Sequence, residues 1–409
     1  MANILVISPI PTLPIDSGNR ARLNLLLSEL KSAGHRIHFL YLERFQTADI
    51  EQMKRLYDSF HVLTYRKKGI LPALSMNVYK VLRKNPGIMG LLDRYIATSR
   101  PFKRKKPFKI DDWYDSRIDE KVQEIKRSYP IDTVIVEYVY LSKVLENFDS
   151  TVLKIIDTHD VFANRERLYE NVGLNPVAFF TTKDEEKKGL SRTDIILAIQ
   201  KEDTEYFSEL TDKKIITLGY RINKNKSSKI LIQPITKSAR YILYIGSNTV
   251  ANQHAMDFFI DNVWAKLKCE LPEIKLLIIG NICHYIERKK SRDGILLKYR
   301  VSNLDDFYKK DCIVINPIFI GTGLKIKNME ALYWARPLVT TKIGAQGLRR
   351  WKDKAFLVAN NAKDMQNAIK TLYKRPDLRM KYSEQAMHFV EEYNLEYDKA
   401  LKTFLSQLT

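Results

Sequence analysis

The sequence predicts an α/β protein made of two doubly wound domains that face a cleft. Three observations predict this fold class. The chain has 409 residues, which suits two domains at roughly 100–200 residues each. Short β-branched runs alternate with helical patterns along most of it, as in parallel sheets covered by helices. A polar stretch, residues 221–240, interrupts this alternation and divides it into two similar halves.

The first half contains continuous apolar runs, which are typical of strands buried on both faces of a parallel sheet. The strands expected are Ile4–Ile7, Ile37–Tyr41, Thr133–Val136, Leu153–Ile156 and Ile195–Ile199. Between the first two, Arg20–Ala33 has leucines at helical spacing, and Gly34 follows where a glycine often ends a helix.

The second half repeats the pattern with six expected strands and four helices. The strands are Tyr241–Ile245, Lys275–Ile279, Leu296–Val301, Cys312–Asn316, Leu338–Thr341 and Phe356–Val358. The helices are Gln253–Lys268, Leu304–Lys309, Leu324–Ala335 and Lys363–Tyr373. Two amphipathic helices, Asp377–Tyr393 and Leu395–Gln407, are expected to complete the chain. Both halves are therefore predicted to form Rossmann-like units.

Composition excludes several classes of protein. Hydrophobic residues make up 45% and charged residues 28%, which is a globular composition. No apolar run approaches the roughly 18 residues that span a bilayer, so an integral membrane protein is not expected. The N-terminal apolar run breaks at Pro9 and predicts a buried strand rather than a signal peptide. The three cysteines show no zinc-ligand spacing, which suggests a reduced, cytoplasmic chain.

Positive charge is concentrated in one segment. Residues 66–109 hold thirteen Lys/Arg and one acid, which gives +12 of the net +20. Apolar residues are interleaved with these cations, a pattern that favours an anionic membrane surface. A solvated basic face on a covered helix pair is the alternative interpretation. Nucleic-acid binding is not expected, because no recognition-helix, RNP-like or zinc-finger pattern accompanies the charge.

The most informative motif runs from Ile315 to Leu332. An expected strand enters a loop with two glycines, Gly321 and Gly323, and the loop opens an apolar helix. Lys325 and Lys327 fall in the expected first turn, where the helix dipole disfavours cations. Two lysines there indicate a compensating anion such as a diphosphate. A plain turn followed by an ion pair from Lys327 to Glu330 is the alternative interpretation.

This motif, together with the segment 333–348, resembles the nucleotide-sugar site of GT-B glycosyltransferases, most closely the large retaining family 4 type (glycosyl transferases group 1). The resemblance implies that Lys325 and Lys327 hold the donor diphosphate and that Glu330 binds the ribose. It also implies that Thr322 and Gly323 lie at the donor and that a C-terminal helix crosses back to the first domain.

Shorter segments resemble the same family. The loop 9–20 resembles the one that folds over the donor phosphates, which implies roles for Gly18 and for Arg20 or Arg22. His159 follows a strand, as does the family histidine that touches the donor sugar. Gly246 and Val301 match the segments that lie beneath the donor and read its base. A structural turn at Gly18 and a structurally capped histidine at His159 remain as alternatives.

Two departures bear on the chemistry. Thr322 stands where the family often has a second glutamate, which leaves the identity of the sugar open. No Asp-x-Asp occurs in the chain, and no metal site is expected, so the reaction is expected to need no metal.

The sequence therefore predicts a glycosyltransferase that moves a sugar, with retention, from a nucleotide diphosphate sugar, with UDP-sugar favoured, to a glycan or lipid-linked acceptor in surface polysaccharide synthesis. No cofactor is expected. The expected division is an acceptor-side domain at 1–220, a linker at 221–240, a nucleotide-sugar-binding domain at 241–392 and a terminal helix at 393–409. Peripheral attachment to the inner face of the cell membrane through 66–109 is expected. A UDP-sugar epimerase of the same fold and a non-catalytic glycan- or nucleic-acid-binding subunit are the alternative functions.

Overall fold

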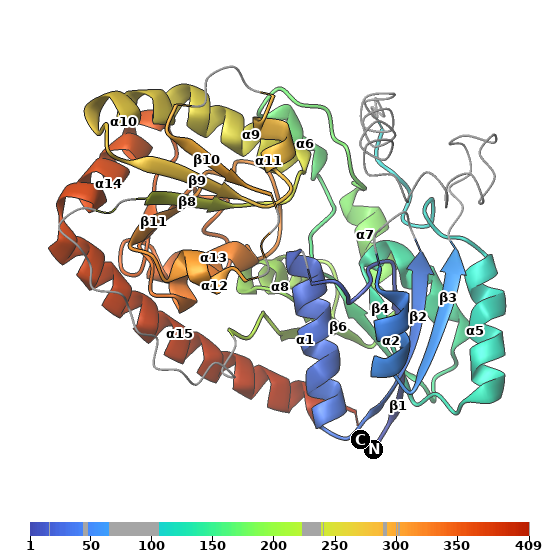
Figure 1. Cartoon of the computed structure of the whole chain (residues 1–409). Coiled ribbons are helices and arrows are strands. Elements are labelled where there is room, and N and C mark those ends of the chain that lie inside the picture. Colours follow the sequence, from blue (N-terminus) through green and yellow to red (C-terminus); the bar gives the residue numbers. More distant parts are fainter. Residues whose placement is uncertain are drawn as a thin grey trace.

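The computed structural model describes residues 1–15, 17–43, 48–64, 106–222, 239, 241–288, 293–299, 301 and 303–408. Figure 1 shows two α/β units side by side, with one long helix running beneath both.

The first sheet has seven parallel strands in the order β3-β2-β1-β4-β5-β6-β7. These strands are β1 (Asn3–Ser8), β2 (Arg36–Glu43), β3 (Ser59–Thr64), β4 (Thr133–Glu137), β5 (Leu153–Asp157), β6 (Ile195–Ala198) and β7 (Lys214–Thr217). The helices around it are α1 (Gly18–Ser32), α2 (Ile50–Leu56), α5 (Arg117–Ser128), α6 (Glu166–Glu170), α7 (Lys183–Leu190) and α8 (Lys201–Ser208), with the 3₁₀ helix η1 (Val139–Asn147).

Helix α1 shows why the sequence pattern was informative. Its four leucines at helical spacing are all buried against the sheet. Gly34 follows with a φ of +86°, a conformation that glycine adopts without steric cost and that ends the helix.

The second sheet has six parallel strands in the order β10-β9-β8-β11-β12-β13. They are β8 (Tyr241–Ile245), β9 (Lys275–Ile279), β10 (Ile295–Lys298), β11 (Cys312–Asn316), β12 (Leu338–Thr340) and β13 (Leu357–Val358). The helices are α9 (Val250–Phe259), α10 (Ala265–Glu270), α11 (Cys283–Ile286), α12 (Asp305–Tyr308), α13 (Ile326–Tyr333), α14 (Ala362–Lys374) and α15 (Pro376–Leu405). A π-helical turn, η2 (Ile260–Trp264), joins α9 to α10, and a 3₁₀ turn, η3 (Arg349–Trp351), follows β12. Two covered parallel sheets confirm the predicted fold class.

The C-terminal helix differs from the prediction in one respect. Two helices with a break near Asn394 were predicted, and the structure has one continuous helix of 30 residues. Neither Gly nor Pro interrupts this stretch. The Asn394 side chain bonds the backbone of Ile222 instead of competing for the backbone of its own helix.

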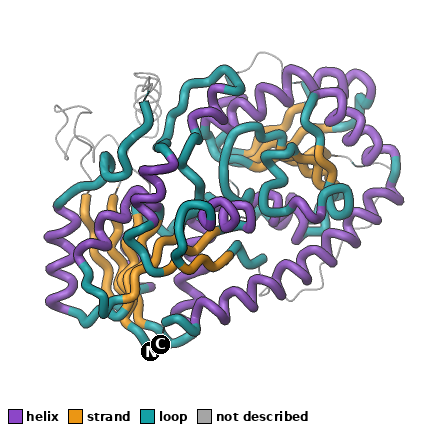
Figure 2. Tube along the Cα trace, turned by 180° about the vertical axis from the view of Figure 1, so that it is seen from behind, coloured by secondary structure: helices purple, strands orange, loops and turns teal. Residues whose placement is uncertain are grey.

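Helix α15 crosses from one domain to the other, as predicted. Ala386 and Phe389 are buried in the core of the second domain. Leu401 and Phe404 are buried in the core of the first domain. The two chain ends consequently lie next to each other at the base of the first domain (Figures 1 and 2).

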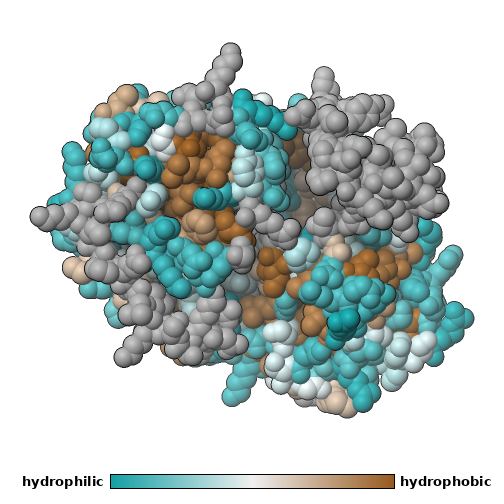
Figure 3. Space-filling view, in the orientation of Figure 1, coloured by the Kyte–Doolittle hydropathy of each residue, from teal (hydrophilic) through white to brown (hydrophobic). Residues whose placement is uncertain are grey.

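Within the described residues, no helix has both the length and the apolar character needed to cross a bilayer. Among the atoms drawn in colour in Figure 3, hydrophilic ones lie toward the outer edge of this face, and apolar ones gather toward the middle on both domains. The expected membrane segment lies almost entirely outside the described residues, because residues 65–105 are not among them.

Candidate active site

Three loops from the two domains meet at the carboxyl ends of their strands. A Cβ on Gly18 would lie 2.9 Å from Ile326 Cγ1, so the loop after β1 touches the start of α13. Gly323, with a φ of +70°, approaches so closely that its Cβ would lie 2.4 Å from the carbonyl oxygen of His159. Thr322 Oγ1 donates a hydrogen bond to Asp160 Oδ1 at 2.8 Å across the same junction. The glycines therefore permit the two domains to touch where the site was predicted.

The structure shows that Lys325 precedes helix α13 instead of lying in its first turn. Its ammonium donates to the carbonyl oxygens of Gly323 at 2.6 Å and Thr322 at 3.2 Å, and it lies 3.3 Å from Gln346 Oε1. Burial lowers the pKa of Lys325 to about 8, although the carboxylates of Asp160 and Asp203 oppose the shift. The Lys325 charge is therefore only partly balanced by its surroundings.

Lys327 lies in the first turn of α13, as predicted, where the charge of Glu330 acts to raise its pKa. Its Nζ lies 3.1 Å from Asn252 Oδ1 and 4.7 Å from the centre of the Tyr244 ring. Burial, followed by repulsion from Lys325, lowers the pKa of Lys327 to about 7. An anion placed between the two ammonium groups would remove that repulsion.

Glu330 is half-buried one turn further along the helix. It accepts a hydrogen bond from the hydroxyl of Tyr308 at 3.4 Å. Burial, with a further contribution from the Glu330 charge, raises the pKa of Tyr220 to about 12. The Glu330 carboxylate therefore interacts with the tyrosines Tyr308 and Tyr220, and it lies on the same helix as Lys327.

The structure brings Gly246 close to Lys327, because both contact the Tyr244 ring. A Cβ on Gly246 would lie 2.8 Å from the Tyr244 ring, which packs under the Lys327 ammonium. Val301 follows β10 and packs against the same cluster of apolar side chains as Tyr308, the partner of Glu330.

Sequence reasoning missed most of a buried ion-pair network around His159. His159 adopts a φ of +57° and its Nε2 hydrogen-bonds Glu137. The same nitrogen lies 3.5 Å from Asp157 Oδ2, and Asp157 also forms an ion pair with Arg22. Burial lowers the pKa of His159, but Asp157 and Glu137 outweigh it and the net shift is upward. The arrangement favours a positively charged imidazole at the domain junction.

The two arginines proposed for the phosphates are engaged elsewhere. Arg22 pairs with Asp157 and donates to the carbonyl of Leu218 at 2.8 Å. Arg20 is buried and donates to the carbonyl of Pro14 at 3.1 Å. The described contacts therefore bring Gly18 to the start of α13 and tie Arg22 to the network around His159.

Glu137, Asp157 and His159 also form the group of described residues whose ligand atoms lie close enough together to hold a metal ion. The Arg22 guanidinium already neutralises Asp157 and would repel a bound cation. We therefore interpret the group as an ion-pair network. The sequence feature that could have indicated this network is the position of the two carboxylates at strand ends. Glu137 and Asp157 end β4 and β5 and are direct partners in the sheet register.

Known proteins resemble both the sequence and the fold. Residues 239–375 match the family described as Glycosyl transferases group 1. An "Uncharacterized 44.6 kDa protein in cps region" of Klebsiella pneumoniae is 22% identical over 390 residues, which cover 88% of each chain.

Solved structures with the same fold cover nearly all of the chain. Sucrose-phosphate synthase of Thermosynechococcus elongatus superposes with a TM-score of 0.67 at 13% identity, covering 100% of this chain and 98% of the other. Anabaena HepE, solved with UDP and glucose, gives 0.60 at 13% identity, covering 99% and 100%. TarM of S. aureus, solved with fondaparinux, alpha-GlcNAc-glycerol and UDP, gives 0.66 at 13% identity and covers 100% of both.

The two covered parallel sheets and the likeness to these structures define the fold of the chain as the two-domain GT-B fold. Within this fold, the match over 239–375 confirms the resemblance to glycosyl transferases group 1.

Proposed function

We propose that the chain transfers a sugar from a nucleotide diphosphate sugar, a UDP-sugar, to a glycan or lipid-linked acceptor during surface polysaccharide synthesis. HepE was solved with UDP and glucose, which supports the choice of donor. The name of the Klebsiella relative places it in a cps region, which supports the role in surface polysaccharide.

The observation that carries the proposal is the pair of half-buried lysines at the start of α13. Burial lowers the pKa of both Lys325 and Lys327, so each ammonium lacks full compensation in the free protein. A donor diphosphate would supply two negative charges at this point. As the bond from the sugar to the diphosphate breaks, negative charge grows on the leaving group and the lysines stabilise it more strongly.

The other predicted residues take positions around this pair. Glu330 would accept the ribose hydroxyls, with Tyr308 holding its carboxylate. His159 would orient the sugar, since Glu137 fixes one ring nitrogen and the touching Gly323 loop brings the donor lysines nearby. We propose transfer with retention, as the resemblance to the retaining family implies. We also propose that no metal ion is needed, because charge neutralisation is assigned to the two lysines.

The alternatives differ in what they release. A transferase liberates free UDP only when an acceptor is supplied, whereas a UDP-sugar epimerase converts one UDP-sugar to another and a binding subunit changes neither. The test incubates the full chain with UDP-glucose, UDP-galactose or UDP-N-acetylglucosamine and a polyprenyl diphosphate-linked acceptor, with and without EDTA. We expect acceptor-dependent UDP release that EDTA does not abolish. Conversion of the sugar without UDP release would contradict the proposal.

Attachment to the membrane belongs to the same proposal. The basic segment 66–109 would hold the enzyme at the inner face of the cell membrane, where a lipid-linked acceptor is presented. Nucleic acid is not a proposed partner.

A further inference from the structure

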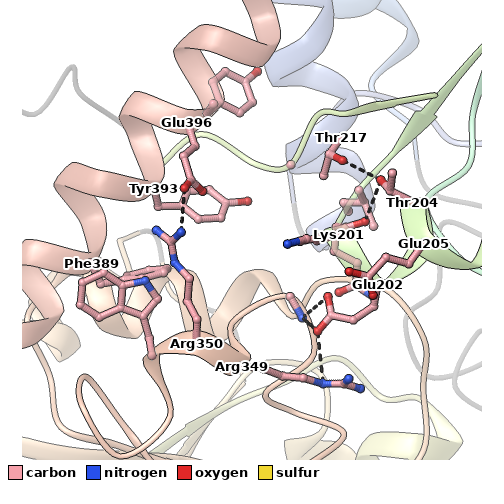
Figure 4. A pocket seen from close by; sticks show the side chains of 16 residues that line it. Lys201, Glu202, Thr204, Glu205, Thr217, Arg349, Arg350, Phe389, Tyr393 and Glu396 are labelled. Atoms are coloured by element: carbon pink, nitrogen blue, oxygen red, sulfur yellow. Dashed lines mark hydrogen bonds and ion pairs between the residues drawn. The ribbon is translucent and has the colours of Figure 1, made fainter. Parts of the chain in front are cut away.

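A cavity of about 580 Å³ lies between the two domains, apart from the candidate active site. Its lining comes from α8, the segment after β7, the turn around η3 and the middle of α15. Neither His159, Lys325, Lys327 nor Glu330 is among the lining residues. Figure 4 shows side chains from these elements converging on a common space.

The cavity carries balanced charge. Its lining includes three cations and three carboxylates: Lys201, Arg349, Arg350, Glu202, Glu205 and Glu396. Arg350 pairs with Glu396 at 2.8 Å, and Arg349 pairs with Glu202 at 3.2 Å. A diphosphate bound here would face as many carboxylates as cations. Ion-paired guanidinium and carboxylate groups instead offer many donors and acceptors to a neutral polar ligand.

Aromatic rings form one wall of the cavity. Trp351 packs edge-to-face on Phe389 at 5.6 Å, and Phe389 contacts Tyr393 at 5.5 Å. In Figure 4 the Tyr393 ring and the Lys201 amino group reach toward the cavity from opposite sides. An apolar ring wall facing planar polar groups matches a sugar, which has a face of C–H groups and a rim of hydroxyls.

We propose that this cavity is a second saccharide site, which takes a neutral sugar or a neutral residue of a glycan. It does not depend on the assignment of the donor site. The two sites are connected through one loop, since Gln346 lies 3.3 Å from the Lys325 ammonium and the next residue, Gly347, lines the cavity. The lining comes from both domains, so a bound sugar also bridges them.

The test uses saturation-transfer NMR on the full chain carrying Lys325→Ala and Lys327→Ala, which weakens the donor site. The probes are the methyl glycosides of glucose, galactose, mannose and N-acetylglucosamine, with glucose 6-phosphate as a charged comparator. We expect at least one neutral glycoside to bind, and to bind more tightly than glucose 6-phosphate. Adding Lys201→Ala and Glu205→Ala should weaken that glycoside by about tenfold. Both side chains lie on the exposed face of α8, so the fold should survive.

Two further variants make the result decisive. Glu205→Trp should fill the cavity and abolish binding, whereas Glu209→Ala, an exposed residue beyond α8 that does not line the cavity, should leave it unchanged. The proposal is overturned if none of the neutral glycosides binds, if glucose 6-phosphate binds more tightly than all of them, or if the Lys201, Glu205 and cavity-filling changes leave binding unaltered.

Discussion

Lys325 and Lys327 are two residues apart, and their surroundings differ. Lys325 is held by loop carbonyls and faces the carboxylates of the other domain. Lys327 contacts Asn252 and a phenol ring, and the charge of Lys325 repels its ammonium group. The two side chains should therefore contribute separately to the binding of a diphosphate.

Lys327→Ala and Lys325→Ala should each weaken UDP binding. Each change removes a charge-assisted contact worth roughly 1.5–3 kcal/mol. Isothermal titration calorimetry measures the loss. Lys363→Ala is the matched control, because Lys363 is exposed, lies in α14 of the same domain and is outside the segment 315–348. If all three variants and the unmodified protein bind UDP equally, Lys325 and Lys327 do not bind the diphosphate.

The affinity for a UDP-sugar should depend on pH. The pKa of Lys327 is about 7 in the free protein, and a bound diphosphate would raise it because it favours the charged form. Binding therefore takes up a proton, so affinity is highest below pH 7 and falls as the pH rises above it. The fall is at most about tenfold per pH unit for this one proton. Lys325, with a pKa of about 8, adds a loss in the same direction at higher pH.

Calorimetry across this pH range checks the effect, and Lys327→Arg serves as the control because a guanidinium stays charged throughout. The arginine variant should show a flatter profile. A profile for the unmodified protein that is flat from pH 6 to about 9 would show that neither lysine titrates on binding.

The sequence indicated the two lysines of the candidate site but not the partners of His159. The lysines were predicted because cations at a helix start conflict with the helix dipole, which is a local signal. The pairing of Glu137 with His159 was not predicted, because it depends on β4 lying next to β5 with Glu137 opposite Asp157. Strand order and register are tertiary properties that one sequence does not specify.

At the scale of elements, predictions were best where apolar periodicity was strong. The helix at α1 and the strands at β1, β8 and β11 agree with the sequence within a few residues. The edge strands β3 and β7 were not predicted. Their residues are mostly half-buried rather than continuously buried, so they lack the apolar run that identified the central strands.

The continuity of α15 gives a prediction at this scale. Asn394 accepts from the Ile222 N–H and donates to the Ile222 carbonyl, both at 3.0 Å and buried. Asn394→Ala should leave both backbone groups unpaired, each at a cost of roughly 1–3 kcal/mol. Urea denaturation should show a lower free energy of unfolding. Met380→Ala, at an exposed position of the same helix, should have little effect. Equal stability of the two variants would show that the Asn394 contacts do not hold the connection in place.

For the whole molecule, the two domains are tied by α15, by the junction at Gly323 and by ion pairs such as Arg349 with Glu202. The candidate active site and the second cavity both lie between them. The residues proposed for the donor site fall mostly in one motif of the sequence, whereas no single stretch of sequence could indicate the cavity. Its lining comes from segments spread between Ile199 and Tyr397.

The last prediction concerns the net charge of +20, of which +12 falls in residues 66–109. If that segment holds the enzyme on anionic lipid, the protein should sediment with phosphatidylglycerol-containing vesicles at low salt and be released at high salt, because surface attraction is screened over about 8 Å at 0.15 M ionic strength. Changing Arg104, Lys105 and Lys106 to Glu lowers the charge of the segment by six units, to +6.

This triple variant should lose vesicle binding and activity on a lipid-linked acceptor while keeping its affinity for UDP. The matched control changes three exposed lysines of α14 and α15, Lys363, Lys381 and Lys399, to Glu. It lowers the net charge by the same six units but leaves the segment intact, so it should still sediment with vesicles. Release of both variants alike would mean that overall charge, and not residues 66–109, attracts the protein to lipid. Retention of both, or failure of the unmodified protein to bind vesicles, would leave the segment as a solvated basic face.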